Sequence, residues 1–111
     1  MRIEQTDLAD VLLLVPTPHA DDRGLFTRTF DAEIFDAHLG EPGAAARFVQ
    51  DSQSRSMRGV LRGMHGRSGR GEAKLVRCAQ GAIHDVLVDI RPESATFGRR
   101  QAFLLDGADF H

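Results

Sequence analysis

Two side chains in the middle of the sequence have the chemistry that proton transfer at a carbon atom requires, His65 and Lys74. Histidine is the side chain that gains and loses a proton nearest neutral pH, so His65 is a candidate general base. Lys74 is the single lysine among 14 basic residues, and its compact ammonium group could stabilise negative charge on an enolate oxygen. Taken alone, a single histidine is usually structural, and a surface lysine is the alternative for Lys74.

Positive charge is concentrated around these two residues. From Arg55 to Arg77 the chain carries seven of its 14 basic residues and a single acid, Glu72, although the whole chain has a formal net charge of -2. This bias favours an anionic ligand, or else indicates a solvated basic face. A general nucleic-acid or membrane binder is disfavoured by the net charge. Nucleic acid is disfavoured further because the window holds no aromatic side chain on which a base could stack.

Arg62 lies three residues before His65 in this window. In an extended strand the two side chains would point to opposite faces, unless Gly63 bends the path or inserts a bulge. Periodicity alone therefore does not bring Arg62 and His65 together.

Short β-prone runs separated by turn residues dominate the chain. We expect strands at residues 11–15, 25–30, 47–54, 59–62, 74–79, 83–90 and 101–105. Loops are expected at 16–24 and 41–46, and a flexible loop at Gly66–Gly71 that could close over a ligand or merely connect two strands. One helix is predicted at 31–39, with Asp31 as N-cap and Gly40 at its end. This order predicts an antiparallel sandwich or barrel.

Length and composition indicate one soluble domain over residues 1–111. The longest apolar stretch, Val11–Val15, is far too short to cross a bilayer, and the acidic N-terminal region is unlike a signal peptide, so a cytoplasmic location is expected. The lone cysteine, Cys78, fits a reducing compartment and is expected to be a small buried apolar residue.

Several motifs occur in a fixed order: DDRGLFTRTF, then SRS-x-RGVLRG-x-H ending at His65, KLVR, G-x-x-x-DV-x-VD-x-R and S-x-TFG. In this order they resemble the dTDP-4-dehydrorhamnose 3,5-epimerase family, over about residues 21–105. The resemblance implies an all-β, cupin-like antiparallel jelly-roll barrel with one short helix. It also implies a homodimer that needs no metal or organic cofactor and acts on a dTDP-4-keto-6-deoxy sugar.

The resemblance further implies a role for each matching residue. His65 would abstract a proton next to the keto group, and Lys74 would stabilise the enolate. Arg62 would bind the diphosphate, for which a bidentate guanidinium is apt. The nucleotide would be contacted partly across the dimer interface, by Arg23, Phe26, Arg28, Gln50 and Ser52. Phe26 could stack on thymine, although it would otherwise be taken for a core residue.

Some positions depart from the family pattern. The family usually has an acid at the position of Arg28, an asparagine at that of Ser52, and an aromatic residue followed by glutamine at those of Gly66 and Arg67. Its catalytic tyrosine and the aspartate that orients the histidine would fall beyond His111, and the sequence contains no tyrosine. We therefore expect a barrel that is incomplete at the C-terminus, in a truncated chain or in a short homologue that binds without turnover.

Two other functions compete with that of an epimerase. The first is a non-catalytic cupin module that binds an anionic sugar nucleotide, which would also account for the basic window. A metal-dependent cupin is disfavoured, because Arg67 occupies the position of the second histidine in the usual metal-binding pair and would repel a cation.

Overall fold

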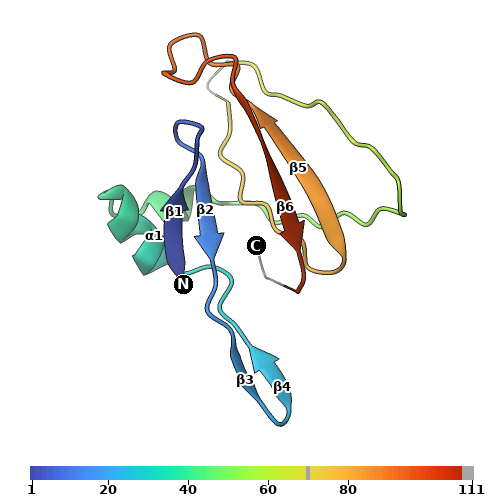
Figure 1. The fold of residues 1–111 in the computed structure, drawn as a ribbon. Helices are drawn as coiled ribbons and strands as arrows, with labels where there is room; N and C mark the ends of the chain where they lie inside the picture. Colours follow the sequence, from blue (N-terminus) through green and yellow to red (C-terminus); the bar gives the residue numbers. More distant parts are fainter. Residues whose placement is uncertain (70, 109–111) are drawn as a thin grey trace.

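The computed structural model describes residues 1–69 and 71–108. It contains three two-stranded antiparallel sheets, β1–β2, β3–β4 and β5–β6, and one α-helix (Figure 1). In chain order the elements are β1 (Arg2–Gln5), β2 (Leu12–Val15), β3 (His19–Asp21), β4 (Gly24–Phe26), α1 (Ala32–Leu39), the 3-10 helix η1 (Ala44–Arg47), β5 (Ala82–Val88) and β6 (Arg100–Asp106). The predicted combination of antiparallel strands with one short helix is confirmed.

The α-helix begins and ends where the sequence predicts. The side chain of Asp31 accepts a hydrogen bond from the backbone N–H of Ile34 and so satisfies a donor that the first turn leaves free. Gly40 ends the helix in the left-handed conformation, with a φ of 64°. Local chemistry is sufficient to define this element, because both caps act within one turn of the helix.

An aromatic cluster attaches the helix to its flanks. The rings of Phe30, Phe35 and Phe48 lie 5.6 to 6.0 Å apart, in tilted and edge-to-face arrangements, and all three side chains are half-buried. The carboxylate of Asp36 also accepts hydrogen bonds from the backbone N–H groups of Gly43 and Ala45. Residues 41–46 were expected to be a loop, but this carboxylate orders them into the start of η1.

The strands β3 and β4 form a tight hairpin inside the region predicted as a loop. Its turn places Gly24 at a φ of 125°, which favours glycine, and the carboxylate of Asp21 accepts a hydrogen bond from the backbone N–H of Arg23. The hairpin stands away from the other two sheets (Figure 1), and the residues of both strands are exposed. The predicted strand at 25–30 is therefore correct only as far as Phe26.

The longest ladder pairs β5 with β6, from Ala82 opposite Asp106 to Val88 opposite Arg100. Both strands were predicted within two residues of their observed ends. The predicted strands at 47–54, 59–62 and 74–79 are wrong, because no strand occurs among residues 48–69 and 71–81. An extended segment becomes a strand only where another backbone completes its hydrogen bonds, and periodicity does not reveal whether that partner is present.

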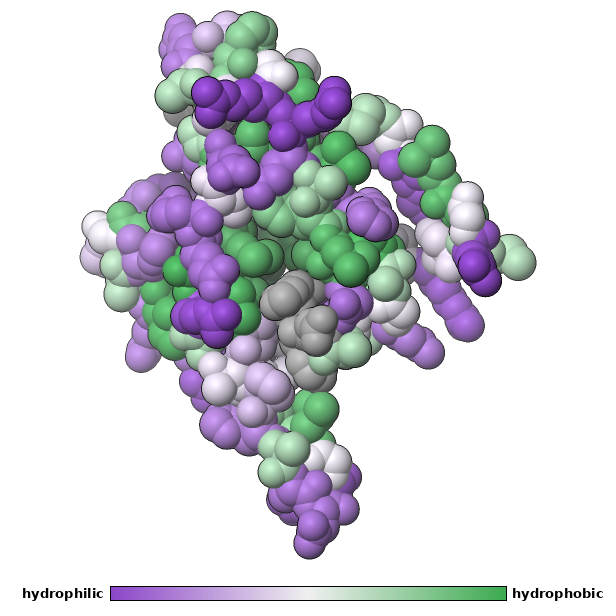
Figure 2. All heavy atoms as spheres, in the orientation of Figure 1, coloured by the Kyte–Doolittle hydropathy of each residue, from purple (hydrophilic) through white to green (hydrophobic). Residues whose placement is uncertain are grey.

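The described part of the chain buries little apolar surface. The buried apolar residues are Leu8, Val15, Ala44, Cys78 and Leu105. Cys78 is thus the small buried residue that was expected. In Figure 1 the segment that follows the helix swings out in a wide loop beside β5, and Figure 2 shows this arm separated from the body, with apolar side chains on it. Leu61, in this segment, is 92% exposed.

Candidate functional site

The two proposed chemical residues lie on the irregular segment between η1 and β5. His65 is exposed and makes no hydrogen bond or ion pair with another described residue. Lys74 lies beyond the following turn, and its ammonium group is 3.2 Å from a carboxylate oxygen of Glu72. No contact between described residues links His65 to Lys74, so the structure does not assemble the two into a pair. Their roles remain predictions.

Arg62 is held by its own segment. Its guanidinium donates to the hydroxyl of Ser56 at 2.8 Å and to the backbone carbonyl of Arg55 at 3.3 Å. Gln50 and Ser52 precede this stretch and are exposed, without hydrogen bonds to other described residues. The three residues are therefore accessible to a ligand, but the described contacts do not aim them at a common point.

The other predicted nucleotide contacts lie on the hairpin and two residues beyond its end. Arg23 forms an ion pair of 2.6 Å with Asp21, and this contact lowers the pKa of the Asp21 carboxyl. Phe26 is 70% exposed and does not lie in the core. Arg28 forms an ion pair of 2.6 Å with Asp31, the N-cap of the helix. Arg28 therefore has a structural partner, whereas the ring of Phe26 is free to stack on a planar group.

Glu72 stands out in the sequence as the single acid of the basic window, but it was not predicted as a site residue. One of its carboxylate oxygens lies 3.1 Å from Nε of Arg67, and the other lies 3.2 Å from Nζ of Lys74. The Lys74 hydrogen bond, followed by the charge of Arg67, holds the pKa of Glu72 below its ordinary value. Its position two residues before Lys74 was the available signal, since side chains at i and i+2 of an extended chain share a face.

A second polar cluster joins the β1–β2 turn to the connection between β5 and β6. The carboxylate of Asp89 accepts hydrogen bonds from the side chains of Arg91, Ser94 and Thr96. Arg91 reaches across to the carboxylate of Asp10 at 2.6 Å. These five residues are named the Asp89 clasp. The partners of the Asp89 carboxylate are thus members of the clasp, and none of its hydrogen bonds with other described residues involves His65.

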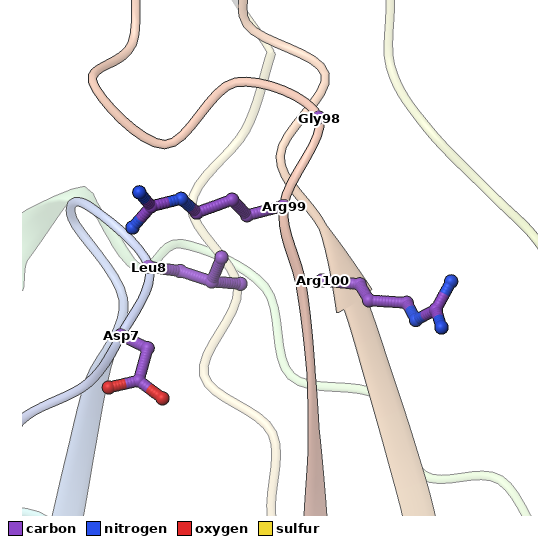
Figure 3. A pocket seen from close by; sticks show the side chains of 5 residues that line it. All are labelled: Asp7, Leu8, Gly98, Arg99 and Arg100. Atoms are coloured by element: carbon purple, nitrogen blue, oxygen red, sulfur yellow. The ribbon is translucent and has the colours of Figure 1, made fainter.

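Two hollows of the surface are lined by residues other than the predicted site residues. One, of about 510 Å³, is lined by Asp7, Leu8, Gly98, Arg99 and Arg100. In Figure 3 the side chain of Arg99 extends over Leu8, while that of Arg100 points to the opposite side. Another hollow, of about 430 Å³, lies beside α1. Because its two guanidinium groups diverge, the first hollow does not form a converging anion site.

No group of three or more metal-ligating side chains occurs among residues 1–69 and 71–108. Within the same residues, no helix is long and apolar enough to span a membrane. The predicted flexible loop at 66–71 contains a bend and turn at Ser68 and Gly69. Residue 70, which belongs to that predicted loop and to the basic window, lies outside the described residues.

Comparison with known proteins gives a consistent family match. The model of the dTDP-4-dehydrorhamnose 3,5-epimerase family matches residues 5–111. The dTDP-4-dehydrorhamnose 3,5-epimerase of Escherichia coli (strain K12) is 46% identical over 106 residues, which cover 95% of this chain and 56% of that protein.

Solved structures give the same result. The dTDP-4-dehydrorhamnose 3,5-epimerase of Elizabethkingia anophelis NUHP1 superposes with a TM-score of 0.87 at 38% identity, covering 99% of this chain and 59% of that one. The dTDP-6-deoxy-D-glucose-3,5-epimerase of Legionella pneumophila Philadelphia 1, solved in complex with dTDP-4-keto-L-rhamnose, superposes with a TM-score of 0.85 at 39% identity, covering 97% of this chain and 56% of that one. The chain thus spans a little over half the length of these relatives.

Proposed function

Because this chain belongs to the dTDP-4-dehydrorhamnose 3,5-epimerase family, with its cupin-like fold, we propose that the protein is an isomerase that epimerises a dTDP-4-keto-6-deoxy sugar. The observation that carries the proposal is the extent of the family match, which runs through residues 5–111 and includes His65, Lys74 and Arg62. The Legionella relative with dTDP-4-keto-L-rhamnose bound supports the substrate class. The reaction would belong to deoxysugar biosynthesis of the dTDP-rhamnose type, in the cytoplasm.

In the proposed mechanism, His65 removes the proton from a carbon next to the keto group. The electron pair of the broken C–H bond moves into a new C=C bond, and the carbonyl oxygen takes up negative charge. Lys74 would donate to that oxygen as the charge develops. A proton returning to the opposite face completes the epimerisation. No residue of this chain is assigned as the proton donor, since the sequence contains no tyrosine.

Substrate binding would be carried by other residues. Arg62 presents a planar guanidinium suited to two diphosphate oxygens, and its present partners, a hydroxyl and a carbonyl, are weaker acceptors than phosphate. Phe26 and Arg23 on the hairpin would contact the base and its flank, with Gln50 and Ser52 as polar contacts. Arg28 would contact the nucleotide only after its ion pair with Asp31 is broken. The chemistry transfers protons without a change in oxidation state, so it requires no redox cofactor.

A homodimer is part of the proposal. A two-stranded hairpin is marginally stable by itself, and the β3–β4 hairpin stands away from the body with Phe26 exposed (Figure 1). An arm of this kind gains stability by docking on a second copy, where Arg23 and Phe26 would complete the partner's site.

A non-catalytic binding module remains the second candidate. The observation that favours it is the absence of any contact between His65 and Lys74 among the described residues. Such a module would bind the same nucleotide through Arg62 and the hairpin without moving a proton.

Solvent deuterium exchange distinguishes the two candidates. In D2O we expect the protein to incorporate deuterium at carbon 3 or carbon 5 of a dTDP-4-keto-6-deoxy sugar, as measured by mass spectrometry and NMR. His65→Asn should abolish the incorporation and leave dTDP affinity nearly unchanged, because a base acts mainly in the transition state. Tight binding without incorporation by the unsubstituted protein would exclude the epimerase in favour of the binding module.

A further inference from the structure

The position of His65 depends on the backbone that carries it, because its side chain has no polar partner among the described residues. The ring lies toward Gly63, where an added Cβ would be 3.8 Å from Nδ1 of the imidazole. Gly63 has a φ of 128°, a value that favours glycine. Both features are local to the segment, and neither attaches His65 to a sheet.

The next residue, Gly66, lies against the end of a sheet. In Figure 1 the chain returns from its wide loop to the end of β5, and a Cβ added to Gly66 would lie 3.6 Å from Cδ1 of Ile90. This is an ordinary van der Waals distance, so the Ile90 side chain lies directly beside the residue that follows His65. The backbone of the candidate base is thus close to a side chain from a distant part of the sequence.

The backbone around Ile90 is firmly held. Its two neighbours, Asp89 and Arg91, belong to the Asp89 clasp, and the Asp89 side chain is 3% exposed. The backbone N–H of Asp89 also donates to the carbonyl of Arg99 at 2.9 Å, and its carbonyl accepts from the N–H of Gly98 at 2.7 Å. Ile90 itself is β-branched, which restricts its rotamers. Its side chain is therefore a fixed point beside an otherwise irregular segment.

We propose that Ile90, anchored by the Asp89 clasp, is a positioning residue for His65. Its side chain supports the backbone at Gly66 and restricts where the imidazole can lie. The inference rests on the proposed function, in which His65 removes a proton from the substrate. A base must lie within hydrogen-bond reach of that proton, and a misplacement of about 1 Å can slow a reaction about a hundredfold. Ile90 needs no contact with the substrate for this role.

The NMR signal of the His65 imidazole tests the proposal without substrate. The chain has five histidines, and the signal of His65 is the one that His65→Asn removes. Ile90→Ala should narrow this signal and move it toward its position in the urea-unfolded chain, because the ring gains motion. Ile83→Ala is the matched control. It makes the same change at an exposed position near the start of β5, and it should leave the His65 signal unchanged.

Deuterium exchange into the proposed substrate gives the functional readout. Ile90→Ala should lower kcat for exchange roughly tenfold to a hundredfold and change KM less than about twofold, because the contact places the base and not the ligand. Ile90→Val retains a β-branched side chain and should restore kcat to within about threefold of the unsubstituted protein.

The two readouts separate the positioning role from the proposed function. A His65 signal that Ile90→Ala leaves unchanged, or that Ile83→Ala changes equally, would overturn the proposal. A rise in KM without a loss in kcat would also overturn it, because Ile90 would then act on the ligand. If the unsubstituted protein exchanges no deuterium while the NMR response is as expected, the positioning role stands and the proposed epimerase alone is refuted.

Discussion

The carboxylate of Asp89 links the stability of the fold to pH. Its side chain is 3% exposed, and it accepts hydrogen bonds from Arg91, Ser94 and Thr96 at 2.5 to 2.9 Å. The Arg91 contacts are the largest cause of a strong lowering of the Asp89 pKa, followed by the Ser94 and Thr96 hydroxyls. Every donor favours the charged form, so Asp89 is a carboxylate in the folded protein at all ordinary pH values.

This lowering predicts a loss of stability in acid. A carboxyl whose pKa is lower in the folded than in the unfolded chain binds fewer protons when folded, so it stabilises the fold above its unfolded pKa of about 3.9. The stabilisation is lost progressively as the pH falls below about 4. We expect the Tm of Asp89→Asn to be well below that of the unsubstituted protein at pH 7, and the difference to narrow between pH 4 and pH 2.

Thermal melts at several pH values provide the measurement. Asp22→Asn is the control, because Asp22 is exposed and makes no ion pair or side-chain hydrogen bond with another described residue. Its Tm should follow that of the unsubstituted protein at every pH. A difference for Asp89→Asn that is independent of pH would contradict the electrostatic explanation.

Lys74 and Arg62 should give different kinetic signatures if the protein is the proposed epimerase. Lys74→Ala should slow deuterium exchange by roughly a hundredfold to a thousandfold, the range for the loss of one donor to a developing oxyanion. Arg62→Ala should instead raise KM with little change in kcat, because the diphosphate is present in the ground state and transition state alike. Steady-state rates measured by NMR separate the two effects, and equal loss in kcat for both variants would refute the assignment.

At the scale of elements, the aromatic cluster explains why a helix of eight residues is ordered in this chain. A helix of this length is not stable alone. It is stabilised because Phe35 packs against Phe30 on one flank and Phe48 on the other. Because these three rings come from before, within and after the helix, the cluster also fixes the path of the chain into the irregular segment.

Removal of one ring should therefore destabilise the protein measurably. Phe35→Ala should lower the free energy of unfolding by about 1–3 kcal/mol, less than for a fully buried phenylalanine because the ring is half-buried. Ile34→Ala on the same helix, at a more exposed position, should cost less than about 1 kcal/mol. Urea denaturation of both variants is the measurement, and equal costs would show that the cluster adds nothing to ordinary burial.

The Asp89 clasp has an equivalent role between the sheets. Arg91 binds Asp89, which lies with it on the connection between β5 and β6, and also Asp10 beside β2. Thr96 accepts a hydrogen bond from the backbone N–H of Ala9. The β1–β2 sheet is thereby attached to the end of the β5–β6 sheet by polar contacts. Since little apolar surface is buried in the described part of the chain, these polar contacts have a correspondingly larger share in keeping the two sheets together.

At the scale of the whole molecule, the chain exposes more surface than a compact protein of its mass. Its accessible surface is 9355 Å², whereas about 6,100 Å² is typical of a folded monomer of 12.2 kDa. Its radius of gyration, 15.3 Å, likewise exceeds the value of about 13 Å for a compact domain of this length. The excess surface is larger than a standard protein–protein interface of about 1,600 Å². A large part of the surface is therefore available for contact with further protein.

The proposed homodimer predicts how the hairpin contributes to association. We expect sedimentation velocity to show a dimer at micromolar concentration, and Phe26→Ser to weaken the association at least tenfold, because a large aromatic side chain would lose its burial on the partner. Leu39→Ser, at an exposed position on the helix away from the hairpin, is the control and should leave the association unchanged. A monomer at every accessible concentration would exclude the dimer.

Local sequence determined several elements of this protein directly. The helix is defined by Asp31 and Gly40, the strand β2 by a short apolar run, and the family by ordered motifs that the comparisons confirm. Each of these depends on interactions within a few residues or on residue identity alone. The positions of the candidate site residues were also named from the sequence, through the family motifs, and their roles remain predictions.

Only the tertiary structure decided which extended segments become strands and which charges meet. Residues 74–79 have the composition of a strand, but pairing requires a second backbone, and spacing within the segment does not specify one. The ion pair between Arg91 and Asp10 joins residues 81 positions apart, and the ion pair between Arg67 and Glu72 depends on a turn. Spacing along the chain fixes neither, because both contacts form only once the backbone has folded back.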